Sequence, residues 1–279
     1  GRLNVLIEVA QGLATVAGGV LAEFSYFWCY AACVVIAVLA LLPVLWMAEP
    51  PQCGKAADTA GGSAKDAPAE GTPAQRTIWE TVKHHFAVSA CILQKDAKIG
   101  KIIGFYSVVF AAHTLLFFYS QQYFADFGYN KVQISVIMLL VGGASCLGAL
   151  ASEKMYRRFG KRCLIPETVI IAAAILCYGS GKAGVAAAAL MCAGFANAAL
   201  YPIQSDSLNA LIPSEQRATL ISVDSMCFSI AMIVLFPLAG ALADRWGLKT
   251  VLLLLGAILL LFLLAAFCIE KESFSSDHS

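Results

Sequence analysis

The chain has 279 residues, a formal net charge of +1, a charged fraction of 13% and a hydrophobic fraction of 59%. Ordinary soluble domains are roughly 25% charged, so these few charges could not cover a water-exposed surface, and we expect an integral membrane protein. The sequence contains no basic stripe interleaved with aromatic residues, so no nucleic-acid partner is expected.

Windows of about 20 mostly apolar residues predict membrane-spanning helices. Eight such windows follow one another along the chain, so the predicted fold class is an all-α integral membrane protein. The first window is the weakest because it contains Glu8 and Gln11. The predicted spans are 4–22, 27–47, 99–123, 132–152, 164–181, 184–205, 217–239 and 248–269.

The segment 51–98 separates the second span from the third. Its first half is rich in Pro, Gly, Ala and small polar residues, and such a composition predicts a flexible linker because it cannot bury enough apolar area to order itself. The stretch TIWETVKHHFAVSACILQKDAK that follows predicts an amphipathic helix that lies on the membrane surface or against the next bundle of helices. His84 and His85 in this stretch are expected to be solvated or interfacial.

The distribution of Lys and Arg predicts the orientation in the membrane, because cytoplasmic loops carry an excess of both residues. When the linker is placed on the cytoplasmic side and the spans alternate, the cytoplasmic segments hold most of the 19 basic residues. Both termini are then expected to be cytoplasmic, and the membrane to be the plasma membrane. The opposite side holds Lys131, Lys182, Arg245 and Lys249.

The chain is predicted to have two spans before the cytoplasmic linker and six after it. This arrangement suggests two six-span halves, the first of which lacks four spans here. Four more spans before the first span would give six on each side of the linker, and we expect them in the intact protein, of which a chain that begins with Gly1 is expected to be a portion. The expected organisation is therefore residues 1–50 as the last two helices of an N-terminal six-helix half and 51–98 as a cytoplasmic linker with an amphipathic helix. Residues 99–279 would form a C-terminal six-helix half and a short cytoplasmic tail.

Four local motifs accompany these spans. The stretch GALADRWGLK (240–249) contains the pattern G-x-x-x-D-R-x-G-x-K between the last two spans. The stretch GALASEKMYRRFGKR (148–162) keeps a glycine, a basic cluster and a closing Gly-Lys-Arg, with Ser-Glu near the place of the Asp. The third and fourth are IPSEQRAT (212–219) and AQGLATVAGG (10–19).

These motifs, in this order, resemble those of the major facilitator superfamily of secondary transporters, with this chain equivalent to spans five to twelve. AQGLATVAGG resembles the span-five antiporter motif, but Ala14-Thr15 stands in place of the usual Gly-Pro and leaves antiport in doubt. The general character of the later spans resembles bacterial multidrug exporters. The residues that carry the family motifs are Gly240, Asp244, Arg245, Gly247, Lys249, Gly148 and Gly160.

The resemblance implies twelve helices in two halves that rock around a midplane site for a small molecule. The sequence contains no Walker motif and no catalytic constellation inside a span, so neither ATP-driven transport nor an enzyme is expected. The ten cysteines are scattered without a CxxC pair, and no metal site or cofactor is expected. Beyond the substrate and the lipid bilayer, protons are the expected partner, and the intact protein is expected to be a monomer.

The span within 99–123 is the most aromatic, and in the family fold its equivalent would line the central cavity. A pocket of aromatic rings with a few uncharged polar groups suits amphipathic or lipophilic cationic molecules, through apolar burial and cation–π contacts. The alternative is that this helix serves packing and the interfacial aromatic belt. The cavity candidates are Tyr106, Phe110, His113, Phe117, Gln121 and Asn197.

Charged residues near the cytoplasmic ends of two spans form a second group of candidates, because a charge facing lipid costs several kcal/mol. Asp206 and Asp224 could form a cytoplasmic gate with Arg217 or with Arg157 and Arg158. One aspartate could instead carry a coupling proton, and Asp224 is the better candidate because it lies deeper. Both could also be structural, at a helix end or bonded to backbone. Arg217 begins a helix, where an acidic side chain or lipid headgroups could hold it.

The leading hypothesis is a proton-coupled exporter of amphipathic or drug-like compounds that works by alternating access. The first alternative is a nutrient or metabolite importer of the same superfamily. The second is a membrane sensor that keeps the fold without transporting.

Overall fold

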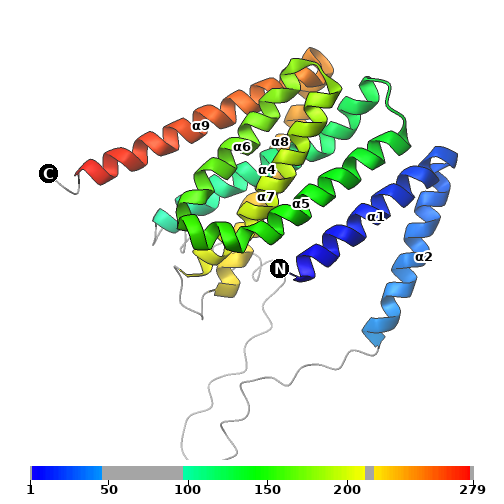
Figure 1. Cartoon of the computed structure of the whole chain (residues 1–279), viewed down its shortest axis with the longest axis horizontal. Helices are drawn as coiled ribbons and strands as arrows, with labels where there is room; N and C mark the ends of the chain where they lie inside the picture. Colours follow the sequence, from blue (N-terminus) through cyan, green and yellow to red (C-terminus); the bar gives the residue numbers. More distant parts are fainter. Residues whose placement is uncertain (1, 46–96, 211–216, 277–279) are drawn as a thin grey trace, which may run out of the picture.

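The computed structural model describes residues 2–45, 97–210 and 217–276, and for 2–5, 8, 97–98, 161–162, 217–219 and 266–276 it describes the backbone alone. Within these residues the chain is α-helical with no β-strand, which confirms the predicted all-α fold (Figure 1). The helices are α1 (Arg2–Phe24), α2 (Tyr26–Leu45), α4 (Ala97–Asp126), α5 (Lys131–Phe159), α6 (Leu164–Cys177), α7 (Ala183–Asn209), α8 (Arg217–Trp246) and α9 (Leu248–Ser276), with short 3₁₀ turns η1 (Gly160–Cys163) and η2 (Tyr178–Ser180) at the two ends of α6.

Six of the described helices, α2, α4, α5, α7, α8 and α9, are long and apolar enough to cross a membrane. The spans predicted at 4–22 and 164–181 correspond to two shorter apolar helices, Val9–Phe24 and Leu164–Ser180. Five of the longer helices, α4, α5, α7, α8 and α9, continue beyond the predicted windows, because backbone hydrogen bonding does not stop where polar side chains begin. In α5, for example, the helix runs past residue 152 to Phe159.

The helices from α4 to α9 gather into one bundle (Figure 1). In this bundle α5 packs against α7, α7 against α6, α4 against α8, and α9 against both α6 and α8. On its other side α5 packs against α1, so it lies between α1 and the rest of the bundle. From the end of α1 the chain turns sharply into α2, which diverges from the bundle in Figure 1 and has no buried residue.

Small residues allow α5 and α7 to approach closely. A methyl group placed on Gly148 of α5 would overlap the main-chain carbonyl of Phe195 in α7. Gly194 of α7 meets Val141 and Ser145 of α5 in the same way, at 3.0 and 2.9 Å from the position that a Cβ atom would take. Close backbone approach at small residues drives helix association in lipid, where apolar burial contributes little.

The contact between α1 and α5 also depends on glycine. A Cβ atom on Gly19 would overlap the Ser135 side chain, and one on Gly12 would lie 2.9 Å from Leu139. At the end of this contact the amine of Lys131, the first residue of α5, donates a hydrogen bond to the carbonyl oxygen of Ala22. Gly12 and Gly19 of the first predicted span therefore face α5.

A pair of hydrogen bonds ties α4 to the end of α6 inside the bundle. The hydroxyl groups of Ser120 and Tyr178 lie 2.6 Å apart, and the Tyr123 hydroxyl donates to the Tyr178 carbonyl oxygen at 3.0 Å. All three side chains are buried. Polar groups in hydrocarbon require partners, and here they find them across a helix–helix contact.

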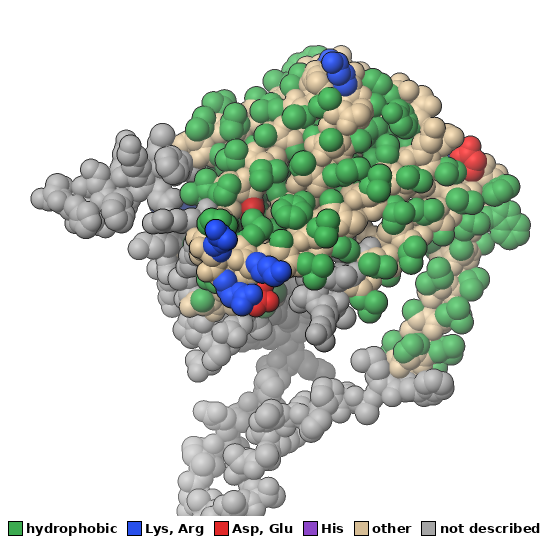
Figure 2. Space-filling view, viewed as in Figure 1, with side chains coloured by type: hydrophobic (Ala, Val, Ile, Leu, Met, Phe, Trp, Pro, Cys, Tyr) green, Lys and Arg blue, Asp and Glu red, His purple; other side chains and the backbone are tan. Residues whose placement is uncertain are grey.

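The surface is consistent with a membrane environment. In the view of Figure 2, hydrophobic side chains cover the middle of the bundle, and Lys and Arg side chains gather at its ends. The exposed group at the end of α5 contains Lys154, Arg157 and Arg158. Charged groups at helix ends can reach the headgroup region, whereas the apolar middle faces the hydrocarbon core. The expected orientation of the termini remains a prediction.

The predicted linker and its amphipathic helix lie almost entirely outside the described residues, because 46–96 are not described. The domain boundaries at 50/51 and 98/99 therefore remain predictions.

Candidate functional site

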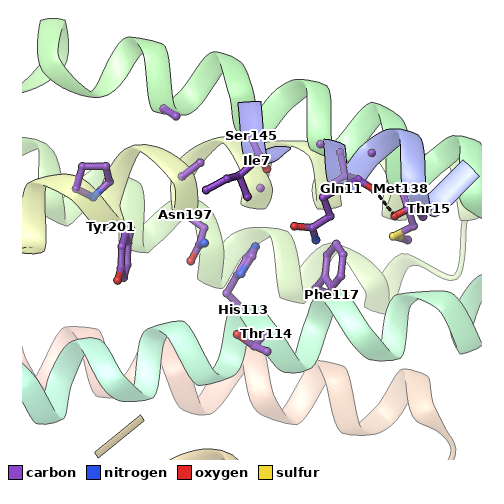
Figure 3. A pocket seen from close by; sticks show the side chains of 17 residues that line it. Ile7, Gln11, Thr15, His113, Thr114, Phe117, Met138, Ser145, Asn197 and Tyr201 are labelled. Carbon is purple, nitrogen blue, oxygen red and sulfur yellow. Dashed lines mark hydrogen bonds between the residues drawn. The ribbon is translucent and has the colours of Figure 1, made fainter. Parts of the chain in front are cut away.

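A cavity of about 400 Å³ lies between α1, α4, α5 and α7. Its wall combines apolar side chains such as Phe117 and Met138 with uncharged polar ones (Figure 3). On each helix the lining residues recur at the spacing of one helical face: His113 and Phe117 on α4, for example, are four residues apart. The helical periodicity of each span thus places several of its side chains on the face that lines the cavity.

Three polar side chains extend into this cavity from three different helices: His113 from α4, Asn197 from α7 and Gln11 from α1 (Figure 3). Two of them carry buried polar atoms without a hydrogen-bond partner among the described residues, namely Nε2 of His113 and Oδ1 of Asn197. Buried polar atoms are satisfied in the great majority of cases, so unpartnered ones that face a cavity are available to a ligand or to water. Thr15 differs, because its hydroxyl donates to the Gln11 carbonyl oxygen at 2.8 Å.

A second cavity, of about 330 Å³, lies between α4, α7 and α8. It shares Thr114, Asn197 and Tyr201 with the first cavity, so the two adjoin. Its wall includes Asp224, the one formally charged residue among the described residues that line either cavity. Among the described side chains Asp224 forms no ion pair. The adjoining cavities thus carry a carboxylate at one end and uncharged polar groups at the other.

Four of the six predicted cavity residues line one or both of the cavities. His113 and Phe117 line the first cavity, Phe110 lines the second, and Asn197 lines both. Tyr106 lines neither, because it is buried with its ring 5.0 Å from Phe105 and 6.1 Å from Phe110 between centroids. Gln121 is exposed and lies outside both cavities. A functional role for each of these residues remains a prediction.

Among the described side chains, no ion pair joins two of the predicted gating residues. Asp206 is exposed near the end of α7, whereas Asp224 lines the second cavity. The Arg157 guanidinium lies 3.9 Å from the Glu153 carboxylate on the same helix, and that of Arg158 lies 5.8 Å from the centre of the Phe159 ring. The side chain of Arg217 lies outside the described residues.

The motif 240–249 lies at a helix junction. Gly240, Asp244 and Arg245 belong to the last two turns of α8, and the chain reverses into α9 at Gly247, whose φ of 80° favours glycine. The Lys249 amine lies beside Gly181, 2.9 Å from the position of a Cβ atom there.

The two glycines of the 148–162 motif have separate roles. Gly148 allows the close contact between α5 and α7, and Gly160 ends α5 with a positive φ of 59°. The glycines of both motifs therefore shape helix contacts and helix ends, and Ala149 of the second motif also lines the first cavity.

Several residues of the site were not predicted. Gln11 marked only the weakness of the first span, yet it extends into the first cavity. Ser107 lines the second cavity with an unpartnered buried hydroxyl. Outside both cavities, Glu167 of α6 is also a residue that was not predicted: it is 1% exposed, and neither of its carboxyl oxygens has a described hydrogen-bond partner. A charged residue within a span was an available signal for Glu167, whereas a lone serine in an apolar helix gave none.

Comparison with protein-family models places the chain in a family. A family model described as Major Facilitator Superfamily matches residues 1–223 and 168–278, which together cover nearly the whole chain. No curated protein matches the sequence significantly.

Proposed function

We propose, since this chain belongs to the major facilitator superfamily and is therefore a secondary transporter, that it exports amphipathic, drug-like molecules in exchange for protons. The observation that carries the proposal is the pair of adjoining cavities, whose walls are aromatic and aliphatic with a few polar groups. Ligand sites of this kind bind through apolar burial and are oriented by a small number of polar contacts.

The location of the first cavity supports alternating access. Its wall combines α1, which we assign to the N-terminal half, with α4, α5 and α7 of the C-terminal half. A site between two halves is exposed to either side of the membrane when the halves rock against each other. The α1–α5 contact near Gly19 and Lys131 would then be one of the contacts that forms and breaks.

Proton coupling requires a side chain on the transport path that gains and loses a proton. Asp224 and His113 are the carboxyl and imidazole groups among the residues that line the two cavities. Buried ionisable groups inside a membrane protein are a functional hypothesis by default, because they are expensive to retain there. We therefore assign coupling to one of these two residues.

An importer of an uncharged polar metabolite is the second candidate. The polar groups of Gln11, Ser145 and Asn197 in the first cavity favour it, because together they could bind hydroxyl or amide groups of such a molecule. The two candidates predict opposite directions of net transport.

The test is efflux of a preloaded lipophilic cationic dye from cells that express the full-length protein, with and without a protonophore. Ser145→Trp would fill the first cavity, whereas Leu150→Trp on the same helix adds the same side chain to an exposed position. We expect efflux that the protonophore and Ser145→Trp abolish and Leu150→Trp preserves. Uptake of polar metabolites without dye efflux would favour the importer. Absence of both would indicate a sensor.

A further inference from the structure

We propose that the second cavity binds the charged head of an organic ammonium substrate, with Asp224 as its counter-ion, while the apolar body of the substrate lies in the first cavity. This inference rests on the proposed transport function and adds to it the chemical class of the substrate and the residue that selects it.

The first argument is charge. Among the described side chains, Asp224 is the one formally charged group on the wall of the second cavity, and it has no basic partner there. An unpaired carboxylate away from bulk water is costly, and a cation that enters the cavity relieves that cost. An anionic substrate would instead be repelled. The cavity is therefore selective for positive charge.

The second argument is hydrogen bonding. Besides Asp224, the cavity wall carries the Oδ1 atom of Asn197 and the hydroxyl of Ser107, both buried and without a partner among the described residues. A primary ammonium group has three N–H donors and no acceptor. One carboxylate and two oxygen acceptors around the same cavity match those three donors in number and kind.

The third argument is the aromatic wall. Phe110, Tyr201 and Phe228 line the same cavity, and the rings of Phe110 and Tyr201 lie 5.6 Å apart at an interplanar angle of 63°. The face of an aromatic ring attracts a cation, and the attraction is stronger when the cation is desolvated. Aromatic rings around a carboxylate favour an organic ammonium over a strongly hydrated inorganic ion.

The helices fix this arrangement. On α8, Asp224 and Phe228 are four residues apart and share one face. On α4, Ser107 and Phe110 are three residues apart and likewise face the cavity. The charged, polar and aromatic groups therefore come from packed helices, which hold binding groups more firmly than loops do.

A metal ion is a poorer occupant of this cavity. Divalent metal sites use several carboxylate, imidazole or thiolate ligands. Among the described residues no group of three or more His, Cys, Asp or Glu side chains is placed to hold a metal ion. Asp224 alone would leave such an ion with mostly neutral ligands.

The substrate body has a defined place. The second cavity adjoins the first at Thr114, Asn197 and Tyr201, and beyond them lie the apolar groups of Phe117 and Met138. A molecule with an ammonium head and an aryl or alkyl body would thus bind across both cavities.

The test measures binding of radiolabelled 4-phenylbutylammonium to the full-length protein in lipid nanodiscs, with 4-phenylbutanol and 5-phenylpentanoate as neutral and anionic analogues. We expect saturable binding of the ammonium, at least about tenfold tighter than either analogue, a difference of about 1.4 kcal/mol. Asp224→Asn should reduce the affinity for the ammonium about tenfold or more and leave that for the alcohol unchanged. Asp224→Glu should restore part of it.

Asp126→Asn is the matched control, because Asp126 is exposed on α4 outside both cavities. Ser107→Ala should weaken the primary ammonium more than its trimethylammonium derivative, which has no N–H donor. Equal affinity for 4-phenylbutylammonium, 4-phenylbutanol and 5-phenylpentanoate would overturn the inference. So would unchanged ammonium binding by a monodisperse Asp224→Asn variant. These binding results are independent of the dye-efflux measurement. Failure of the inference can therefore be told apart from failure of the proposed function.

Discussion

The amine of Lys131 lies 2.7 Å from the carbonyl oxygen of Ala22, to which it donates a hydrogen bond across 109 residues of sequence. Ala22 belongs to the last turn of α1, where carbonyl groups lack partners within the helix and the helix dipole favours a cation. The same amine lies 4.2 Å from the centre of the Tyr26 ring. Lys131 therefore fastens the start of α5 to the turn between α1 and α2.

Replacement of Lys131 should loosen this end of the α1–α5 contact. We expect Lys131→Met to make the first cavity more accessible from the side of the membrane on which α1 ends. The measurement is the rate at which a membrane-impermeant thiol reagent, added on that side, labels Ser145→Cys in a background without other reactive cysteines. Lys182→Met, at an exposed lysine before α7, is the control. Equal labelling in the two backgrounds would show that the bond does not hold the contact closed.

Gly19 and Gly18 form a matched pair for the same contact. A methyl group on Gly19 would overlap Ser135, whereas nothing lies within 4 Å of the corresponding position on Gly18. Overpacking typically costs about 1–3 kcal/mol, so Gly19→Ala should lower the thermal unfolding temperature of the full-length protein and Gly18→Ala should not. Combining Gly19→Ala with Ser135→Gly should recover part of the loss. If the two alanine variants unfold alike, the packing of α1 on α5 is not as close as described.

The Ser120–Tyr178 pair predicts an asymmetry between two conservative variants. The Ser120 hydroxyl also donates to the Leu116 carbonyl oxygen at 2.5 Å, so Tyr178→Phe leaves it bonded. Ser120→Ala instead leaves the buried Tyr178 hydroxyl without this partner, and an orphaned buried group costs about 1–3 kcal/mol. We expect Ser120→Ala to be the more destabilising change in thermal unfolding measurements. The reverse order would mean that the Tyr178 hydroxyl finds another partner.

His113 should contribute to transport more than to stability. Its Nε2 atom is buried without a described partner, and removing such an atom relieves a desolvation cost. We expect His113→Phe to unfold at the same or a higher temperature than the wild type while dye efflux falls severalfold. Loss of both properties would show a structural role instead. Functional groups that are retained at a cost to stability are common in binding sites.

Most of the helices could be predicted from the sequence, because the apolar window that indicates a membrane-spanning helix is a local pattern. An apolar window in lipid must form a helix, since every backbone group needs a partner, and so the spans at 27–47 and 184–205 matched α2 and α7 within a few residues. The ends were harder to place. The helix α8 continues through Asp244 and Arg245 because helical hydrogen bonding does not depend on the polarity of the side chains.

The site was less accessible from sequence because it depends on contacts between distant helices. The periodicity of α4 indicated that His113 and Phe117 share a face, and both line the first cavity. The same reasoning could not show that Gln11 of α1 extends into that cavity or that Ser107 shares a cavity with Asp224. The bond from Lys131 to Ala22 ends on a main-chain oxygen, which no residue type reveals.

The contact of Gly148 with Phe195 has a mechanical consequence. Where two helix backbones touch, no side chains lie between them that could change rotamer and allow the helices to slide. We therefore expect α5 and α7 to move as one rigid unit. Motion during a transport cycle must then fall on contacts made by side chains, such as that of Lys131 with α1. The pair α5 and α7 forms one wall of the first cavity. The shape of this wall would therefore stay the same while its exposure to either side of the membrane changes.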